Sequence, residues 1–411
     1  MTSLTDQRRK TGAFALVGLM SLALFINYID RGNLATGAAQ IRADLDFSAT
    51  AYGALLAGFY FTYAFCQLPA GALADRFGGK LILGLGAALW SLSTLLTGFV
   101  EGFAGLLVLR LLLGMGESVA FTASSKIIAG NVPRERIGLA NGVIGFGYLV
   151  GPAVGTLAGG LLMAQWGWRA VFILFGLLSL LWLIPWSRVR IEEQAGPASG
   201  TAVAPVSMRQ ILRRRELWGA SLGHFAGNWN WYFILGYLPM YLEMARGFSK
   251  QEMAGVVSAA YLVNALAALA GGYLIDRAIK AGRTPTLACK LPMAAAHLAG
   301  LGCMLAMPLL PIEACIALLF VYEVFLGLSS PGYFMIPQIL AGPQAAARWV
   351  GIQNMAGNLP GIIGMIFAGV LIDAGDGAYF AAFAIAGAIN VLGLIGWLGI
   401  LGRIEPIDWT K

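Results

Sequence analysis

The sequence predicts an all-α membrane protein with twelve transmembrane helices in two pseudo-symmetric six-helix bundles. Three observations lead to this prediction. Of the 411 residues, 58% are hydrophobic and 11% are charged, whereas soluble proteins carry roughly 25% charged residues. The apolar residues gather in stretches of the length that spans a bilayer, about 20 residues each. One Asp-Arg motif also occurs at the same place in both halves of the chain.

Twelve stretches are long enough to cross a bilayer, and only helices satisfy their backbone hydrogen bonds in lipid at this length. In chain order the expected spans are residues 12–37, 48–74, 80–100, 103–128, 136–164, 168–187, 217–243, 251–278, 284–308, 311–336, 346–374 and 378–402. The first span follows the basic residues Arg8, Arg9 and Lys10 and is longer than the core of a removable signal peptide. We therefore expect this first helix to be retained.

The distribution of Lys and Arg predicts that both termini lie in the cytoplasm. With the N-terminus inside, most of the 27 Lys and Arg residues fall in inner segments, and the outer loops hold Arg42, Arg169, Arg246 and Lys250. Such an asymmetry is the usual orientation signal of membrane proteins. The net charge of +7 is therefore a topology signal, and we expect no nucleic-acid partner.

One polar segment divides the chain. Residues 188–216 carry Gly, Pro and Ser and end in basic residues, which is typical of a cytoplasmic linker. We expect an N-terminal six-helix bundle over residues 1–187 and a C-terminal one over residues 217–411. Asp75-Arg76 ends the second span and Asp276-Arg277 ends the eighth, so the halves repeat. Parallel repeats of this kind form one known transporter plan, in which the substrate binds between the halves near the midplane.

The loop after the second span reads GALADRFGGK over residues 71–80 and resembles the signature loop of the major facilitator superfamily. An Asp in such a loop can accept hydrogen bonds from a helix N-terminus, and Arg or Lys can pair with acids. We expect Asp75, Arg76, Asp276 and Arg277 to form a cytoplasmic latch that stabilises an outward-open state. The alternative is a plain cytoplasmic turn.

Charged residues inside the spans are the candidates for function, because charges at membrane depth usually face a bundle interior or a water-filled path. Arg31 lies roughly 9 Å below the outer surface, and Arg110 lies roughly 10 Å below it on another helix. Glu117 follows Arg110 by seven residues on the same helical face. We expect the two arginines to grip a carboxylate, and Asp30 and Glu117 to couple transport to protons.

The alternative for these four residues is a fixed set of structural salt bridges. Asp30 would pair with Arg110, or Arg31 with Glu117. Such a set would be costly where apolar residues could replace it, so we favour a role in binding and coupling.

Polar and aromatic residues at helical spacing extend the candidate site. Asn27 and Tyr28 share a helical face with Arg31. The other members are Tyr60, Tyr63 and Gln67 in the second span and Asn354 and Asn358 in the eleventh. Each buried Asn has the alternative role of bridging two helices.

The fifth span is rich in glycine, with Gly147, Gly151, Pro152 and Gly155. The pattern resembles the Gly-Pro motif of proton-driven drug antiporters, but we favour close helix packing as its role. Glu323 in the tenth span has two open interpretations, since it can face a central cavity or pair locally.

The remaining chemistry-bearing residues indicate no enzyme. His224 and His297 lie on different helices without a zinc-binding spacing. There is no Gly-Lys-Ser/Thr phosphate loop, so ATP is not expected to drive the protein. We expect the four cysteines to act as small apolar packing residues: Cys66, Cys289, Cys303 and Cys315.

Three stretches resemble the anion:cation symporter family of the major facilitator superfamily, which includes bacterial galactonate and hexuronate transporters and the sialin and vesicular glutamate carriers. Residues 27–34 (NYIDRGNL) resemble its first-helix motif. Residues 110–117 (RLLLGMGE) resemble its fourth-helix Arg…Gly…Glu, and residues 224–242 resemble its seventh-helix block. The resemblance implies the major facilitator fold and proton-coupled transport of an organic anion.

The resemblance also implies roles for single residues. Arg31 matches the family's substrate-linked arginine, Arg110 its helix-4 arginine, and Asp30 and Glu117 its protonatable acids. Two tyrosines match residues that line the sugar-acid site: Tyr28 and Tyr63. The sequence departs from the family at Tyr148, where sugar-acid members often carry a polar amide, and around Asn354 and Asn358. An aromatic or smaller carboxylate therefore stays open beside a sugar acid.

We thus expect a proton-coupled symporter of an organic anion, working by alternating access in the inner (cytoplasmic) membrane of a bacterium. Its partners would be a small organic anion and the lipid bilayer. We expect a monomer without cofactor, with protons as the coupling ion. A drug:proton antiporter is the alternative, although paired membrane arginines do not suit cationic drugs. A membrane receptor and a membrane enzyme are weaker alternatives, because the sequence offers neither a signalling domain nor a nucleophile or metal set.

Overall fold

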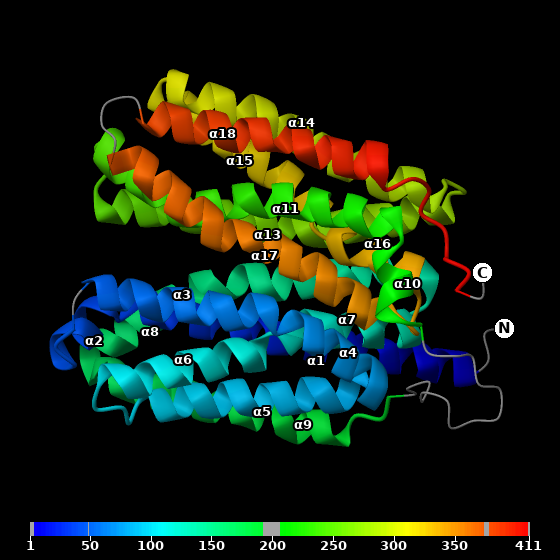
Figure 1. The fold of residues 1–411 in the computed structure, drawn as a ribbon, viewed down its shortest axis with the longest axis horizontal. Helices are drawn as coiled ribbons and strands as arrows, with labels where there is room; N and C mark the ends of the chain where they lie inside the picture. Colours follow the sequence, from blue (N-terminus) through cyan, green and yellow to red (C-terminus); the bar gives the residue numbers. More distant parts are fainter. Residues whose placement is uncertain (1–3, 48, 192–205, 374–377, 410–411) are drawn as a thin grey trace. The chain divides into compact units, whose positions relative to one another are not determined.

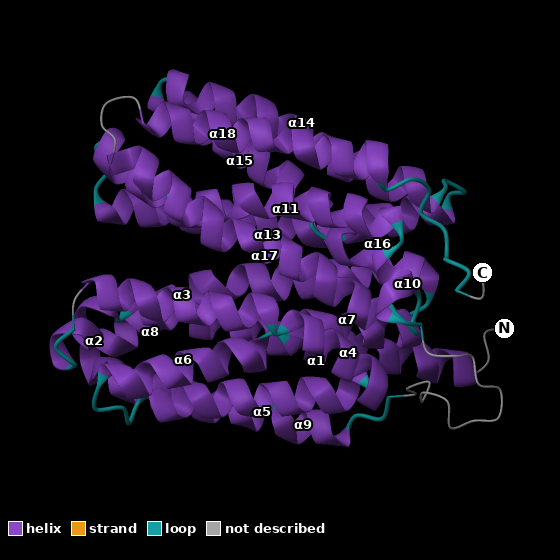
Figure 2. Cartoon of the chain, in the orientation of Figure 1, coloured by secondary structure: helices purple, strands orange, loops and turns teal. Residues whose placement is uncertain are grey.

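The computed structural model describes residues 4–47, 49–191, 206–373 and 378–409 (Figure 1). Within these ranges the chain forms helices joined by short loops, without a strand (Figure 2). The chain divides into two compact units. Unit 1 comprises residues 1–134, 143–206 and 341–351, and unit 2 comprises residues 135–142, 207–340 and 352–411.

Unit 1 contains nine helices of the described chain. They are α1 (Leu4–Thr36), α2 (Ala38–Asp44), α3 (Ala49–Phe65), α4 (Gln67–Phe77), α5 (Gly79–Thr97), α6 (Phe103–Glu117), α7 (Val119–Asn131), α8 (Ile137–Leu181) and α9 (Leu183–Arg188). Helix α8 begins with residues that belong to unit 2. Helix α3 packs against α6, and α5 packs against α6 and α7.

Unit 2 is built from the helices of the second half. They are α10 (Met208–Leu212), α11 (Arg215–Gly236), α12 (Leu238–Met240), α13 (Lys250–Lys280), α14 (Pro285–Ala306), α15 (Ile312–Ser329), α16 (Gly332–Ala341), α17 (Ala346–Asp373) and α18 (Ala378–Leu394). Short π-helical turns follow α12 and α18 over Tyr241–Ala245 and Ile395–Ile400. Helix α13 packs against α15, and α14 packs against α15 and α18.

Eight helical segments of the described chain are long and apolar enough to cross a membrane. The second, seventh and eleventh predicted spans are not among them, and the fifth and sixth fall in one segment. The second and seventh are interrupted. Helices α3 and α4 are separated at Cys66, three residues before Pro69, and α11 and α12 at Tyr237, two residues before Pro239. Proline supplies no backbone N–H and disturbs the preceding helical turn, so interruptions at these places are expected.

The fifth and sixth predicted spans form one assigned helix, α8. Its backbone leaves helical geometry at Gly167, where φ is 75° and ψ is 164°. Glycine adopts a positive φ without the steric penalty of a side chain. The two predicted spans are therefore separated by a sharp bend at Gly167 rather than by a loop.

Two short helices lie outside the predicted spans. Helix α2 lies in the first predicted outer loop, and α10 lies in the predicted linker. The signal for α10 is readable in the sequence: the side chain of Ser207 accepts a hydrogen bond from the Gln210 backbone, and Gln210 accepts one from the Ser207 backbone. This reciprocal pair is a capping box, which starts a helix.

The glycines of the fifth span bring α8 close to α1. A Cβ atom at Gly147 would meet the Ser21 backbone, one at Gly151 would meet Phe25, and one at Gly155 would meet Ile29. Small residues at this spacing let two helices approach closely in a membrane. Close packing therefore accounts for this glycine pattern.

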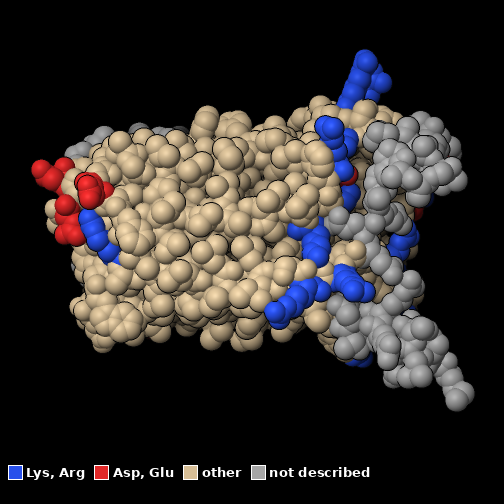
Figure 3. All heavy atoms as spheres, turned by 90° about the horizontal axis from the view of Figure 1, so that it is seen from below, with Lys and Arg blue, Asp and Glu red and all other residues tan. Residues whose placement is uncertain are grey.

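Large apolar side chains remain exposed along the helices. Leu157 is 68% exposed, Leu291 65% and Phe99 62%. On the face in Figure 3, uncharged residues form a broad band, with most of the visible Lys and Arg toward one end of it. A band of this kind is the surface that a protein presents to lipid.

Candidate functional site

Arg31 is the centre of the charged site in unit 1. Its Nε donates a hydrogen bond of 2.7 Å to Oε2 of Glu117, and its Nη2 donates one of 3.3 Å to Oδ1 of Asn27. The Glu117 side chain is fully buried, whereas the Arg31 side chain is 15% exposed. The guanidinium thus bridges a buried acid and the more accessible part of the site.

Aromatic rings surround the same guanidinium. Its carbon lies 4.2 Å from the centroid of the Tyr28 ring and 4.3 Å from that of Tyr63, with Phe59 at 5.3 Å. Tyr148 extends this group, since its ring centroid is 5.3 Å from that of Tyr28. Cation–π contacts of this kind fix the plane of an arginine without using its hydrogen-bond donors. Arg31 is therefore held in place with donors still available for an anion.

The side chain of Asp30 contacts α5, whereas that of its neighbour Arg31 contacts α6. One of its carboxylate oxygens accepts a hydrogen bond of 3.1 Å from the Thr94 hydroxyl on α5. The other oxygen is buried and has no hydrogen-bond partner among the described residues. A buried carboxylate in this position is costly unless it is paired or neutral.

Arg110 is 4% exposed and lies on α6. Among the residues that the structure describes it forms no salt bridge, and Asp30 is not within ion-pair distance of it. Of the two salt bridges considered from the sequence, the Arg31–Glu117 pair is present and the Asp30–Arg110 pair is not. Within the described chain, one guanidinium is thus paired with an acid and the other is not.

Gln67 adds unsatisfied polar groups to unit 1. Its side chain is fully buried, and neither its amide nitrogen nor its carbonyl oxygen has a hydrogen-bond partner in the part of the chain that the structure describes. The amide nitrogen of Asn27 is in the same condition. Buried polar atoms are nearly always paired, so such exceptions point to a ligand, water or proton that completes them.

Asn354 and Asn358 belong to unit 2, on α17. Asn358 accepts a hydrogen bond of 2.6 Å from the Tyr232 hydroxyl on α11 and donates one of 2.6 Å to the Asn354 backbone carbonyl. The Asn354 amide nitrogen is buried without a partner in the described ranges. Asn358 therefore joins two helices, as the alternative interpretation of these residues proposed, while Asn354 keeps a donor for another group.

The carboxylates of the two Asp residues in the repeated motif contact the N-termini of other helices. Oδ2 of Asp75 accepts a hydrogen bond of 3.2 Å from the backbone N–H of Arg348 at the start of α17. Oδ1 and Oδ2 of Asp276 accept bonds of 2.9 Å and 2.7 Å from Gly138 and Leu139 at the start of α8. A carboxylate is stabilised at the positive end of a helix dipole. Each motif thus ties the end of one helix to the start of another within its unit.

The Arg residues of the motif take no part in these contacts. Arg76 is exposed and stacks on Phe77, and the exposed Arg277 donates a long hydrogen bond of 3.5 Å to Tyr273. Asp75 instead pairs with Lys126 at 3.4 Å and with the Arg348 side chain at 3.3 Å.

Several residues of these sites were missed by the sequence analysis. Thr94, Phe59, Lys126 and Arg348 contact the predicted residues, yet each is distant from its partner in the chain. Tyr232 was noted only as part of a motif. The sequence carries no local signal for these contacts, because they depend on which helices pack side by side.

The two histidines are buried polar residues of unit 2. The indole N–H of Trp397 donates to Nε2 of His297 at 3.1 Å, and Nδ1 lies 3.0 Å from Oδ1 of Asn390. Because an indole can only donate, Nε2 must accept and Nδ1 must carry the proton. The His224 ring packs at a tilt against Tyr333, and its Nδ1 lies 3.3 Å from the amide nitrogen of Gln353.

Comparisons with known proteins identify the family of this chain. Residues 20–365 match the family model described as the Major Facilitator Superfamily. The probable sulfoacetate transporter SauU of Cupriavidus necator is 30% identical over 96% of this chain and 95% of its own length. The probable L-galactonate transporter of Escherichia coli is 28% identical over 95% of this chain and 89% of its own length.

Two solved structures share the fold. The proton:xylose symporter XylE, bound to 6-bromo-6-deoxy-D-glucose, has a TM-score of 0.78 at 14% identity, covering 97% of each chain. The fucose:proton symporter FucP of Escherichia coli has a TM-score of 0.76 at 15% identity, covering 93% of this chain and 98% of its own. At these identities the likeness concerns the fold alone.

Proposed function

Because this chain belongs to the Major Facilitator Superfamily and is a multi-pass membrane transporter rather than an enzyme, we propose that it carries an organic anion together with protons by alternating access. The observation that carries this proposal is the pair of membrane arginines, of which Arg31 is paired with an acid and Arg110, among the described residues, is not. The relatives named for sulfoacetate and galactonate transport support an anionic substrate.

The substrate's carboxylate would bind Arg31 and Arg110. Guanidinium groups bind carboxylates through paired, charge-assisted hydrogen bonds. The rings of Tyr28 and Tyr63 hold the Arg31 guanidinium in a fixed plane, so little side-chain freedom is lost when an anion binds. The buried amide of Gln67 would bind a hydroxyl or further oxygen of the same ligand. A sugar acid or another carboxylate fits these donors.

Charge balance gives the physical reason for coupling to protons. When all are ionised, Arg31 and Arg110 offset Asp30 and Glu117, so the buried set is neutral. An entering monoanion leaves one uncompensated negative charge, and a dianion two, in a region where such charges are costly. Uptake of one proton for each such charge, by Glu117 or Asp30, restores neutrality. Anion and proton would therefore enter together, which is symport.

Glu117 is the acid most directly linked to the substrate. It accepts the hydrogen bond from Arg31 Nε, and an incoming carboxylate would replace it as the acceptor. Once displaced, Glu117 would be a fully buried carboxylate without its cationic partner, and protonation removes that charge. Asp30, with one oxygen that no described residue contacts by a hydrogen bond, would be the second proton acceptor.

The acid–helix contacts of the repeated motif would form the cytoplasmic latch of the transport cycle. We infer that the contacts of Asp75 and Asp276 hold in one state and break in the other, while Arg76 and Arg277 contribute at the surface. The Lys and Arg distribution supports a bacterial inner-membrane protein with both termini in the cytoplasm. The drug antiporter stays the alternative, and the close packing of the α8 glycines against α1 gives those glycines a structural role.

Uptake by proteoliposomes tests the proposed substrate class. Purified protein would be assayed with radiolabelled L-galactonate, D-glucarate and sulfoacetate, with and without an inward proton gradient. We expect the gradient to stimulate accumulation of at least one anion. Arg31→Ala should abolish uptake, and Arg31→Lys should raise KM because lysine lacks the planar fork. Arg169→Ala, which alters a partly exposed arginine outside the site, is the control and should retain uptake. Intact uptake by Arg31→Ala would refute the assigned anion site.

Exchange assays test the coupling role of Glu117 separately. Glu117→Gln keeps a hydrogen-bond acceptor for Arg31 but cannot ionise. We expect this variant to exchange labelled for unlabelled anion across the vesicle while losing accumulation driven by a proton gradient. Unchanged gradient-driven accumulation would show that the proton is carried elsewhere.

A further inference from the structure

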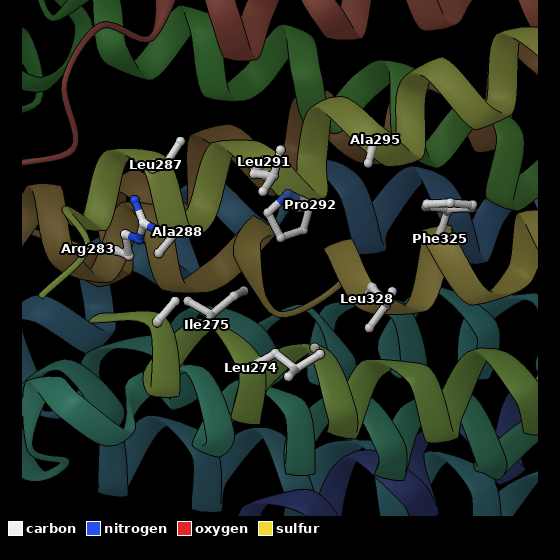
Figure 4. Close-up of a pocket in the computed structure, with 12 residues that line it drawn as sticks. Leu274, Ile275, Arg283, Leu287, Ala288, Leu291, Pro292, Ala295, Phe325 and Leu328 are labelled. Carbon is white, nitrogen blue, oxygen red and sulfur yellow. The ribbon is translucent and has the colours of Figure 1, made fainter. Parts of the chain in front are cut away.

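An apolar groove runs along the surface of unit 2, between α13, α14 and α15. Its volume is about 530 Å³, within the range of about 300–1,000 Å³ that is typical of small-molecule sites. Figure 4 shows the side chains of Leu274, Leu291 and Phe325 around it, with Arg283 at one end. Every other lining residue is apolar.

Small residues and a proline shape this groove. A Cβ atom at Gly271 would meet the Leu328 backbone, so α13 and α15 touch at that point and close the floor. Pro292 lies inside α14 and removes the helical hydrogen-bond donor for the carbonyl of Ala288, which also lines the groove. The recess is therefore part of how these three helices pack.

The chain segment that contributes Arg283 to the groove is strongly basic. Arg277, Lys280 and Arg283 are exposed within seven residues, and no acid occurs between residues 277 and 290. The nearest acid in sequence, Asp276, is 3% exposed and its two oxygens accept backbone hydrogen bonds. In the described chain Arg283 forms no salt bridge. Its guanidinium is available to an anion at the mouth of an apolar slot.

A second groove in unit 1 shows the contrast. It is lined by Leu81, Leu85 and Trp186 and has Lys80 at its rim. The Lys80 ammonium already donates a hydrogen bond of 3.2 Å to the Ser187 carbonyl. An apolar slot with an engaged cation lacks the charge complementarity that the groove of unit 2 offers.

We propose that the groove of unit 2 binds one anionic phospholipid. An acyl chain lies along Leu274, Leu291 and Phe325, and the headgroup phosphate binds Arg283, with Arg277 and Lys280 beside it. From Leu287 to Ala295 the groove follows α14 for roughly 12 Å, which an acyl chain can follow. Basic residues next to apolar surface are the usual recognition elements for acidic headgroups.

Lipid titration of the full chain tests the proposal without any transport assay. Purified protein in neutral detergent would be titrated with palmitoyl-oleoyl phosphatidylglycerol or the matching phosphatidylcholine, and bound lipid counted by native mass spectrometry. We expect one tightly bound phosphatidylglycerol. Arg283→Ala should weaken that binding about fivefold, and the triple change of Arg277, Lys280 and Arg283 to Ala about a hundredfold. Arg283→Lys should restore most of it.

Matched controls separate the groove from general surface charge. Arg403→Ala removes an exposed cation of the same unit outside the groove and should leave binding unchanged. Ala295→Leu narrows the groove without altering charge and should weaken binding, whereas Leu298→Phe on the exposed side of α14 should not.

Three results would overturn the proposal. They are equal binding of the two lipids, equal effects of Arg283→Ala and Arg403→Ala, and undiminished binding to Ala295→Leu. Inorganic phosphate that displaces the lipid at micromolar concentration would likewise overturn it, because the site would then be a free-anion site.

Discussion

Glu323 is a buried ionisable residue outside the charged site of unit 1. Its side chain is fully buried on α15, where one carboxylate oxygen lies 2.5 Å from the Asn264 amide nitrogen on α13. The other oxygen has no hydrogen-bond partner within the described ranges. Of the two interpretations left open by the sequence, local pairing is the one the structure contains. An unpaired carboxylate oxygen is costly in such a buried setting.

Substitution of this pair should separate hydrogen bonding from charge. Glu323→Gln keeps an amide partner for Asn264 and should change the melting temperature of the purified protein little. Asn264→Ala leaves Glu323 buried without its partner and should destabilise the protein by about 1–3 kcal/mol. Thermal unfolding in detergent measures both. If Glu323→Gln proved as damaging as Asn264→Ala, the ionised carboxylate would matter after all.

Arg31 shows how one residue can serve two purposes. Its contacts with Tyr28 and Tyr63 position it, and its bond to Glu117 links it to a group that can take up a proton. The sequence predicted the depth of this arginine and the helical face that it shares with Tyr28. The choice of Glu117 rather than a second acid depends on how α1 is rotated against α6.

At the scale of single elements, the first turns of α8 and α17 are the places where the Asp residues of the repeated motif are bound. Helix α8 begins in unit 2 and continues in unit 1, whereas α17 begins in unit 1 and continues in unit 2. Gly138 of α8 packs against Gly272 of α13, and Ala347 of α17 packs against Gly71 of α4. Each close contact lies beside an Asp of the repeated motif. The glycines thus admit the backbone approach that lets these carboxylates reach a helix N-terminus.

Adding a methyl group at Gly272 should disturb this approach. The new Cβ atom would overlap the Gly138 backbone, which cannot move aside as a flexible side chain could. We expect Gly272→Ala to destabilise the protein by about 1–3 kcal/mol through overpacking and to lower uptake, because Asp276 loses its partners at Gly138 and Leu139. Thermal unfolding and anion uptake by proteoliposomes measure the two effects.

Gly18→Ala is the matched control on α1, since nothing in the described chain lies within 4 Å of its added Cβ atom. Alanine is favoured over glycine inside a helix by roughly 0.5–1 kcal/mol. Its melting temperature should therefore stay level or rise. A Gly272→Ala variant as stable as Gly18→Ala would contradict the proposed role of the close contact.

At the scale of the whole molecule, charge determines orientation. The described helices expose large apolar residues along their length, and basic residues gather near one end of the band in Figure 3. Lipid accepts the apolar band but not the charges, so the basic ends stay on the side of the membrane from which the protein is inserted. Which side of the membrane the basic loops face is a prediction, and chemical labelling of the loops tests it.

Cysteine labelling in intact cells measures that sidedness. Ala43→Cys lies in the predicted outer loop and Ala281→Cys in a predicted inner one, and both positions are exposed. A membrane-impermeant maleimide should label Ala43→Cys in intact cells and Ala281→Cys only after permeabilisation. The parent chain, in which Cys66 is half-buried and the other three cysteines are buried, sets the background. The reverse labelling pattern would place the termini outside.

Hydropathy and spacing along the chain predicted the spans, the repeat of two halves and the residues that place charge at membrane depth. These features follow from hydropathy, length and spacing, which are local properties of the chain. Three features are visible only in the folded chain: Glu117 pairs with Arg31, Thr94 binds Asp30, and α13, α14 and α15 enclose a groove beside Arg283. Such contacts join helices far apart in the chain, and they depend on the rotation and closeness of packed helices, which no local pattern specifies.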